Sequence, residues 1–414
     1  MTAKRFVTRL TAVTLAFCVT FLFSCAPKKI DVDEYPGFET IEETETENTV
    51  EKNTIPVEDI VENGGMTTKE FEEFISIPDP FEETGKFQFY PEAIPECYAR
   101  QYRENPKVIY VAKQMMKAVY DCKTEFEIPP EYQLNYDETY NAINIARMSC
   151  PLLDACEFGT LTDNPLVYSV IYNPKSSYVL DEEGNIDEDQ IGFTQLNDEE
   201  ARKMVVDFTD YVQTIIDNNI SKDDSDMEKA EKIYEAIVKE ISYREKRQYE
   251  EQHYFYSDEE IAEAANSQTT IVEDLINENA TTQTRIALFY QYILTQLNIE
   301  CMTVTSSGAY TSQGIERLDN EMNTTGRNIW NVIVVDGKAY NCDLAFDMLN
   351  YEYEKSENPN YEPVMKYFGM SDKTRADSFN VLDRGNLYIY DPTVDYSWDT
   401  PKKDMVPECK QDYK

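Results

Sequence analysis

Apolar residues recur every three to four positions in four stretches of the chain, which is the spacing of helices that bury one face. The first two stretches are residues 108–119 and 205–215, and the later two are residues 230–241 and 286–297. The third follows Ser225-Asp226-Met227-Glu228, where the serine and the glutamate have the spacing of a capping box. We therefore predict four amphipathic helices, the third beginning at Ser225 and the fourth near Gln283.

Shorter runs rich in β-branched and aromatic residues predict strands between and after these helices. Residues 165–172 have the length of a buried strand and end at Asn173-Pro174, while residues 178–193 indicate a polar hairpin. Later, residues 302–304 resemble a strand, and Asp336-Gly337 is a strong two-residue turn signal between residues 330–335 and 338–343. The mixture predicts an α+β protein, with an N-terminal α+β domain over 87–220 and a second domain after it.

The first residues have the pattern of an export signal. Three basic residues precede an apolar run over 10–23 that is too short to cross a bilayer comfortably. The run ends Leu22-Phe23-Ser24-Cys25, which resembles the lipobox of bacterial lipoproteins, where the cysteine is acylated with chains such as palmitate. We expect residues 1–24 to be a lipoprotein signal peptide and Cys25 to anchor an exported protein to a membrane of the cell envelope. An ordinary secretory signal is the alternative.

Residues 25–86 are dense in Glu, Asp and Thr, as in Glu42-Glu43-Thr44-Glu45-Thr46-Glu47. Such a composition buries too little apolar surface to offset the entropy of ordering the chain. We predict a disordered acidic tether that holds the folded part away from the membrane. Around residues 71–77, where apolar residues reappear, a segment that folds on a partner is the alternative.

Charge and residue counts exclude several classes of function. The chain carries 38 basic and 79 acidic residues, a net charge of −41, and a field of that sign excludes nucleic acid as a partner. His253 is the only histidine, which excludes His-rich metal centres, and we expect neither a metal nor a cofactor. After Cys25 the cysteines are odd in number and form no CxxC pair, so at least one lies outside any disulfide within the chain: Cys97, Cys122, Cys150, Cys156, Cys301, Cys342 and Cys409.

Several weak motifs follow one another in the second half of the chain. In order they are Thr281-Thr282-Gln283-Thr284-Arg285-Ile286-Ala287, Asn298-Ile299-Glu300-Cys301, Asn328-Ile329-Trp330-Asn331, Cys342-Asp343-Leu344-Ala345-Phe346-Asp347 and Tyr367-Phe368-Gly369-Met370-Ser371-Asp372. In their order and spacing they resemble the transglutaminase-like superfamily, relatives of the papain-type cysteine peptidases. The resemblance implies a papain-like domain over 225–385, with a helix packed on an antiparallel sheet, and a C-terminal extension over 386–414.

The resemblance also implies that two catalytic residues are missing. Gln283 stands where members have the nucleophilic cysteine, Asn328 where they have the general-base histidine, and Asp343 where they have the orienting aspartate. An amide is no substitute for a thiolate, and asparagine cannot accept and return a proton near neutral pH as imidazole does. No catalytic residue is therefore expected, while Trp330 and Asn331 would border a retained binding groove.

Neighbouring residues offer no evident replacement for the lost pair. The hydroxyls of Thr282 and Thr284 are better explained as caps of the helix N-terminus. Cys301 and Cys342 fall at strand positions, where small buried side chains are common. His253 lies in a charged stretch between helices and could reach the groove only through an insertion that the sequence does not reveal.

Strand pairing brings the three degenerate positions toward one another. Pairing of Val335 with Lys338 across the turn, continued along both strands, sets Asn328 opposite Ala345, two residues from Asp343. These positions would then meet Gln283 at the mouth of a groove.

Together the residues favour a non-catalytic binding lipoprotein. It would bind a protein or peptide at the cell envelope and attach to the membrane through Cys25. The alternative is an active transglutaminase or cysteine peptidase with a rearranged site. A purely structural cell-envelope protein is a third hypothesis.

Overall fold

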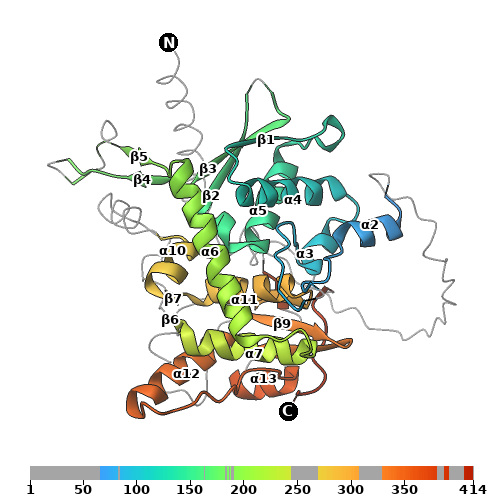
Figure 1. Ribbon diagram of the computed structural model, residues 1–414, viewed down its shortest axis with the longest axis vertical. Coiled ribbons are helices and arrows are strands. Elements are labelled where there is room, and N and C mark those ends of the chain that lie inside the picture. The colour runs from blue at the N-terminus through green and yellow to red at the C-terminus, as the bar shows by residue number, and fades with distance from the viewer. Residues whose placement is uncertain are drawn as a thin grey trace, which may run out of the picture. The chain divides into compact units, whose positions relative to one another are not determined.

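A computed structural model gives the fold of the chain (Figure 1). The residues that it describes all belong to one compact unit. They are residues 66–82, 84–162, 164–181, 184–185, 187, 191–243, 269–306, 329–379, 387–390 and 405–413.

The first half of the described chain combines helices with a small antiparallel sheet. The helices are α3 (Glu96–Gln101), α4 (Pro106–Tyr120), α5 (Tyr136–Ser149) and α6 (Asp198–Asn219), with two short 3-10 turns at Pro130–Tyr132 and Pro151–Ala155. The sheet has the order β1 (Glu125–Glu127), β3 (Val167–Tyr172), β2 (Cys156–Thr160). The predicted helices at 108–119 and 205–215 and the strand within 165–172 are confirmed.

The strand β3 packs with one face only. Its side chains alternate between half-buried and buried, because successive residues of a strand point to opposite faces. A separate two-stranded ribbon follows, in which β4 (Lys175–Ser177) pairs antiparallel with β5 (Gly192–Thr194). Between them Asp181 donates its N–H to the carbonyl of Asn185, and Gly184 turns the chain with φ of +85°. The predicted hairpin is therefore present where the structure describes it.

The second half is built on a four-stranded antiparallel sheet of order β10-β9-β8-β11. Helix α11 (Gln283–Gln296) contacts β8 and β9 of this sheet, and helix α12 contacts both α7 and α11. The strands are β8 (Glu300–Ser306), β9 (Ile329–Val335), β10 (Lys338–Cys342) and β11 (Leu387–Ile389), and the remaining helices are α7 (Asp226–Glu240), α12 (Leu344–Glu357) and α13 (Asp372–Phe379).

Helix α7 begins as its sequence predicts. The Ser225 hydroxyl accepts a hydrogen bond from the N–H of Glu228, and the Glu228 carboxylate accepts one from the N–H of Ser225 at 2.8 Å. Such a reciprocal pair satisfies two N–H groups that the helix start would otherwise leave unbonded. The capping box thus fixes where the second half of the fold begins.

The hairpin at Asp336-Gly337 is confirmed, and its extension is not. Val335 pairs with Lys338, and the register continues to Asn331 opposite Cys342. There the second strand stops, because α12 begins at Leu344. The expected pairing of Asn328 with Ala345 is therefore wrong, since Ala345 lies on a helix. The run over residues 342–346, apolar except for Asp343, suits a strand and a buried helix start equally well, so its period does not decide between them.

A short parallel pair holds the entry to α11. Ser242 and Tyr243 of β6 (Ser242–Tyr243) pair with Ala280 and Thr281 of β7 (Ala280–Thr281). Between these strands the described chain resumes at Thr269 and forms the helical turn α10 (Ile271–Glu273) and the π-helical turn η5 (Asp274–Glu278). Asn279 follows in the left-handed region with φ of +48°, which ends the turn.

The segment before Phe87 is folded where we expected tether. Helix α2 (Thr68–Ile75) begins with a capping box between Thr67 and Glu70. Phe71 and Phe81 are buried in the core. The tether prediction is therefore wrong for residues 66–82 and 84–86. A few spaced aromatic residues dock this segment although its average composition is polar. The earlier part of the predicted tether, residues 25–65, lies outside the described residues.

Contacts with two buried side chains help to fasten the arm, by which we mean the described residues of 66–90. The ammonium of Lys113 on α4 donates to the carbonyl of Phe74 at 2.6 Å and lies 4.7 Å from the centre of its ring. At the other end of the arm, Tyr90 donates its N–H to Oε1 of Gln296 at 3.0 Å and accepts from Nε2 at 3.1 Å. Both anchoring side chains are buried. The arm is thus tied to α4 and to the last residue of α11.

The fold as described is a mixture of helix and antiparallel sheet, which agrees with the α+β class. Buried residues of both predicted domains belong to one hydrophobic cluster. The boundary between those domains near residue 220 stays a prediction. None of the helices in the described ranges is long and apolar enough to cross a bilayer.

Candidate functional site

Gln283 is the first residue of α11. Thr282 holds the N-cap position, but its hydroxyl makes no capping hydrogen bond, so only the position that we predicted for it is confirmed. Thr281, one residue earlier, is buried in β7. Gln283 itself is partly exposed. The side chain at the predicted nucleophile position therefore starts a helix, as the resemblance implies, and carries an amide.

Asn331 ties this helix to the sheet. Its Nδ2 donates to the carbonyl of Ala287 in the first turns of α11 at 2.9 Å, and to the Thr303 hydroxyl on β8 at 3.3 Å. Asn331 and its neighbour Trp330 are both buried. The fold encloses both side chains, and their assignment to a binding groove stays a prediction.

Asp343 lies at the junction between β10 and α12. Its side chain is fully buried, and its Oδ2 accepts a hydrogen bond from Nη1 of Arg375 at 3.0 Å. The Arg375 guanidinium, which belongs to α13, lies 3.9 Å from the centre of the Trp330 ring. A planar guanidinium can stack on an aromatic face and bind a carboxylate at the same time. The carboxylate at the position that the sequence resemblance assigns to an orienting aspartate therefore has a cationic partner in this structure.

The same network continues from Trp330 to the outer strand. Trp330 donates from Nε1 to Oδ1 of Asn341 on β10 at 2.9 Å. Asn341 in turn donates from Nδ2 to Oδ1 of Asp372 at the start of α13 at 3.0 Å. Indole and amide groups of this kind are stable in a core only when they find partners. The structure thus brings Asp343 and Trp330 together through Arg375, which no sequence motif indicated.

A second carboxylate lies one turn along α12. Asp347 accepts hydrogen bonds from the Tyr234 hydroxyl at 2.7 Å and from the backbone N–H groups of Lys366 at 3.1 Å and Tyr367 at 2.9 Å. Burial raises the pKa of Asp347 to about 7, against the opposing effect of these three donors. Tyr234 also donates to the carbonyl of Asp343 at 2.9 Å. Asp347 therefore joins α7, α12 and the chain before Phe368.

Arg285 fixes the approach to α11. It pairs with the buried Asp274 through Nη1, and its Nη2 donates to the carbonyl of Thr269 at 2.6 Å. Thr269 is where the described chain resumes, two residues from the start of α10. Sequence reasoning passed over Arg285 because an arginine near a helix start usually faces solvent.

The described cysteines are poor nucleophiles. Burial raises the pKa of Cys301 well above its ordinary value and that of Cys150 to about 12, and it raises the pKa of Cys342 as well. All described cysteines are free thiols, and only Cys122 is not buried. The prediction that Cys301 and Cys342 are buried strand residues is confirmed. A thiol must ionise to attack, so raised pKa values oppose catalysis at these positions.

Three residues that the sequence analysis singled out for a functional role or weighed for one lie outside the described residues: Asn328, His253 and Cys25. Asn328 directly precedes Ile329, which pairs with Thr305 of β8. Within the ranges that the structure describes, no group of three or more acidic, cysteine or histidine side chains is placed to hold a metal ion.

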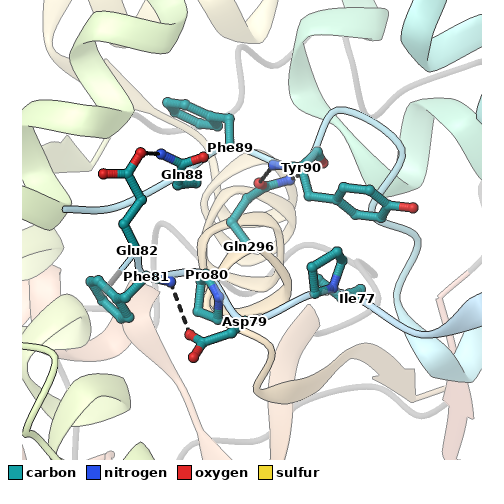
Figure 2. Close-up of a pocket in the computed structure, with 10 residues that line it drawn as sticks. Ile77, Asp79, Pro80, Phe81, Glu82, Gln88, Phe89, Tyr90 and Gln296 are labelled. Atoms are coloured by element: carbon teal, nitrogen blue, oxygen red, sulfur yellow. Dashed lines mark hydrogen bonds between the residues drawn. The ribbon is translucent and has the colours of Figure 1, made fainter. Parts of the chain in front are cut away.

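One cavity of about 250 Å³ lies between the arm and the end of α11 (Figure 2). Four of the polar side chains that line it form hydrogen bonds with other lining residues. Gln296 holds the backbone of Tyr90, Asp79 accepts from the N–H of Phe81 at 2.9 Å, and Glu82 accepts from the Gln88 side chain. The cavity is thus a feature of how the arm docks.

Comparison with known proteins assigns no family. No family model matches the sequence, and no curated protein matches it. Among solved structures, a putative protease from Parabacteroides distasonis ATCC 8503 is similar at 14% sequence identity and a TM-score of 0.21. The match covers 45% of this chain and 35% of that protein, so the chain spans about a third of its length. A TM-score this low carries no argument about fold or activity.

Proposed function

We propose that the chain is an exported lipoprotein whose C-terminal half is a transglutaminase-like domain without its catalytic cysteine and histidine. The domain binds a protein or peptide at the cell envelope and does not turn it over. Acylated Cys25 attaches it to the membrane.

The placement of α11 supports the transglutaminase-like part of this proposal. Gln283 opens a helix that packs on β8 and β9, and Asp343 directly follows the last residue of β10, the outer strand of the same sheet. Asn331 bonds to α11 and pairs with Cys342, the residue before Asp343. The helix start and the carboxylate are therefore linked through a single β9 residue.

The burial of the cysteine thiols supports the part of the proposal that the domain is not catalytic. No cysteine begins α11, and the six buried cysteines of the described chain include every one on the central sheet. Where the pKa shifts of these thiols are resolved, burial raises them, and thiolate chemistry needs the opposite shift. A buried, arginine-bound Asp343 also suits a structural role better than the orienting of a base.

Ligand binding at the start of α11 is tested by placing a bulky side chain there. A Gln283→Trp variant would place a bulky ring there, whereas Val206→Trp would add the same ring to the exposed face of α6, where Val206 is 47% exposed. Both variants and the unaltered chain are passed over peptides made from envelope proteins. Peptides retained by the unaltered chain and by Val206→Trp, and lost by Gln283→Trp, support the proposal. Equal retention by all three contradicts it.

The relation to active enzymes is tested by restoring a cysteine at position 283 and a histidine at position 328. Gln283→Cys combined with Asn328→His should give a thiol that reacts faster than Gln283→Cys alone, because an imidazole nearby favours the thiolate. Equal reactivity of the single and double variants would show that these two positions do not face each other.

The anchor is tested by Cys25→Ser and cell fractionation. We expect the variant to lose membrane association and to remain unprocessed. Unchanged association with the membrane and unchanged precursor processing would refute lipidation at Cys25.

A further inference from the structure

Residues 405–413, here called the strap, lie against a separate part of the chain, residues 367–374, here called the cradle. Two backbone hydrogen bonds join them. Tyr413 donates its N–H to the carbonyl of Gly369 at 2.8 Å, and Cys409 accepts from the N–H of Asp372 at 2.8 Å. The strap has no regular strand of its own, so it is held by contacts of the kind that hold an extended peptide.

Asp412 makes the most specific contact of the strap. Its Oδ1 accepts from the N–H of Ser371 at 2.7 Å, and its Oδ2 accepts from the hydroxyl of Thr374 at 2.8 Å. The backbone bond from Ser371 is the main reason that the pKa of Asp412 lies below its ordinary value. The cradle therefore offers two donors that fit one carboxylate at the start of α13.

Tyr413, the residue after Asp412, packs against Gly369, a position that only glycine can occupy. Gly369 has φ of +72°, and a Cβ added to it would lie 2.7 Å from Cβ of Tyr413. The Tyr413 ring lies 6.0 Å from that of Phe368 and 6.2 Å from that of Tyr340, both edge-on. The cradle thus has an aromatic recess directly beside its carboxylate site.

Two side chains of the strap are buried. Cys409 and Val406 are buried, and the N–H of Cys409 donates to Oδ2 of Asp372 at 3.1 Å. The other oxygen of Asp372 accepts from Asn341 on β10. One carboxylate therefore connects the strap to the sheet and, through Asn341, to Trp330.

We propose that the cradle, with the Tyr340 side chain of β10 beside it, forms a peptide-binding groove that the strap fills in cis. Its ligand in trans is a partner's peptide with an acidic residue followed by an aromatic one, as in Asp412-Tyr413. Backbone pairing gives such a groove its affinity, and the carboxylate site and aromatic recess give its specificity. This goes beyond the proposed function, because it uses neither Gln283 nor the groove beside it.

The test separates the strap from the body in the full chain. A protease site is placed within residues 391–404, the purified protein is cut there under reducing conditions, and helical content is followed by circular dichroism. A fluorescent peptide of the strap sequence is then added, and its binding is measured by anisotropy. Variant peptides carry Asp412→Ala or, as the matched control, Lys410→Ala, because among the described residues Lys410 forms its ion pair with Glu408 inside the strap.

The cut protein should stay folded and exchange its strap for the labelled peptide in a saturable way. The Asp412→Ala peptide should bind about tenfold or more weakly, as the loss of a doubly hydrogen-bonded carboxylate implies, and the Lys410→Ala peptide should bind unchanged. A Thr374→Val protein should bind the unaltered peptide more weakly. The proposal is overturned by unfolding on cutting, by a folded protein that never exchanges, or by equal binding of the Asp412→Ala peptide.

Discussion

Arg375 and Asp343 form a buried ion pair, in which Nη1 of the guanidinium lies 3.0 Å from Oδ2 of the carboxylate. The two residues are far apart in sequence, and the pair joins α13 to the end of β10. Removing one partner leaves a charge in a site from which water is excluded. Such a loss is far more damaging than the absence of both charges.

The first prediction concerns this pair. Arg375→Met should lower the free energy of unfolding by roughly 3–5 kcal/mol, because it strands the Asp343 charge. The double variant Arg375→Met, Asp343→Asn should lower the free energy of unfolding by less than the sum of the decreases in its two single variants. Lys373→Met on the same helix is the control, since Lys373 belongs to an exposed pair with Asp377 and should change little. Urea denaturation measures all four, and strict additivity would contradict coupling.

The second prediction concerns Asp347, whose pKa burial raises to about 7 from an ordinary value of 3.8. Between those values the folded state holds a proton that the unfolded state releases. Its contribution is therefore complete below the lower pKa and is lost as the pH rises toward the higher one.

In Asp347→Asn this loss should be absent. The free energy of unfolding of the unaltered chain should fall more steeply from pH 4 to pH 7 than that of the variant, by a few kcal/mol at about 1.4 kcal/mol per pKa unit. Asp377→Asn, an exposed site, should keep the slope of the unaltered chain. Chemical denaturation across this pH range provides the measurement, and parallel slopes for Asp347→Asn would refute a raised pKa.

The regular elements were predictable because their signals are local. Helical spacing located α4, α6, α7 and α11, and the Asp336-Gly337 turn located the β9–β10 hairpin with its register. The buried pairs were not predictable. Arg375 lies in the polar sequence of α13, which has no apolar stripe to suggest burial, and its partner is distant in the chain. Only the tertiary fold decides such a pairing.

The arm shows a second limit of sequence reasoning. Averaged over 25–86, the composition is that of a chain that cannot fold alone, yet Phe71 and Phe81 bury their rings against the core. Composition describes a window, whereas docking depends on single residues and on the surface that meets them. The same limit applies to Lys113, because a buried lysine has no signature in sequence.

The third prediction follows from the arm. A chain that starts at Met66 should be as stable as one that starts at Ala26. A chain that starts at Phe87 should have a free energy of unfolding lower by about 5 kcal/mol or more. It lacks the buried side chains of Phe71, Ile75 and Phe81, each of which contributes roughly 1.5–3 kcal/mol. Thermal and urea unfolding distinguish these outcomes, and equal stability of all three chains would show that the arm does not contribute to the core.

The fourth prediction isolates how the arm is held. Lys113→Met removes the ammonium that binds the carbonyl of Phe74 and should speed proteolysis within residues 66–82 without altering the rest of the chain. Lys117→Met, one turn along α4 and paired with the half-exposed Asp121, should leave the cleavage rate unchanged. Identical cleavage patterns for both variants would mean that Lys113 is not an anchor of the arm.

The central claim is that the chain has no cysteine nucleophile, and thiol reactivity of the folded protein tests it most directly. A chain starting at Ala26 keeps all seven described cysteines and is treated with a thiol-directed probe under native conditions at neutral pH. We predict slow labelling only, at the half-exposed Cys122, and labelling of all seven after unfolding. Rapid, stoichiometric labelling of a single cysteine in the folded chain would contradict the account and identify an active enzyme.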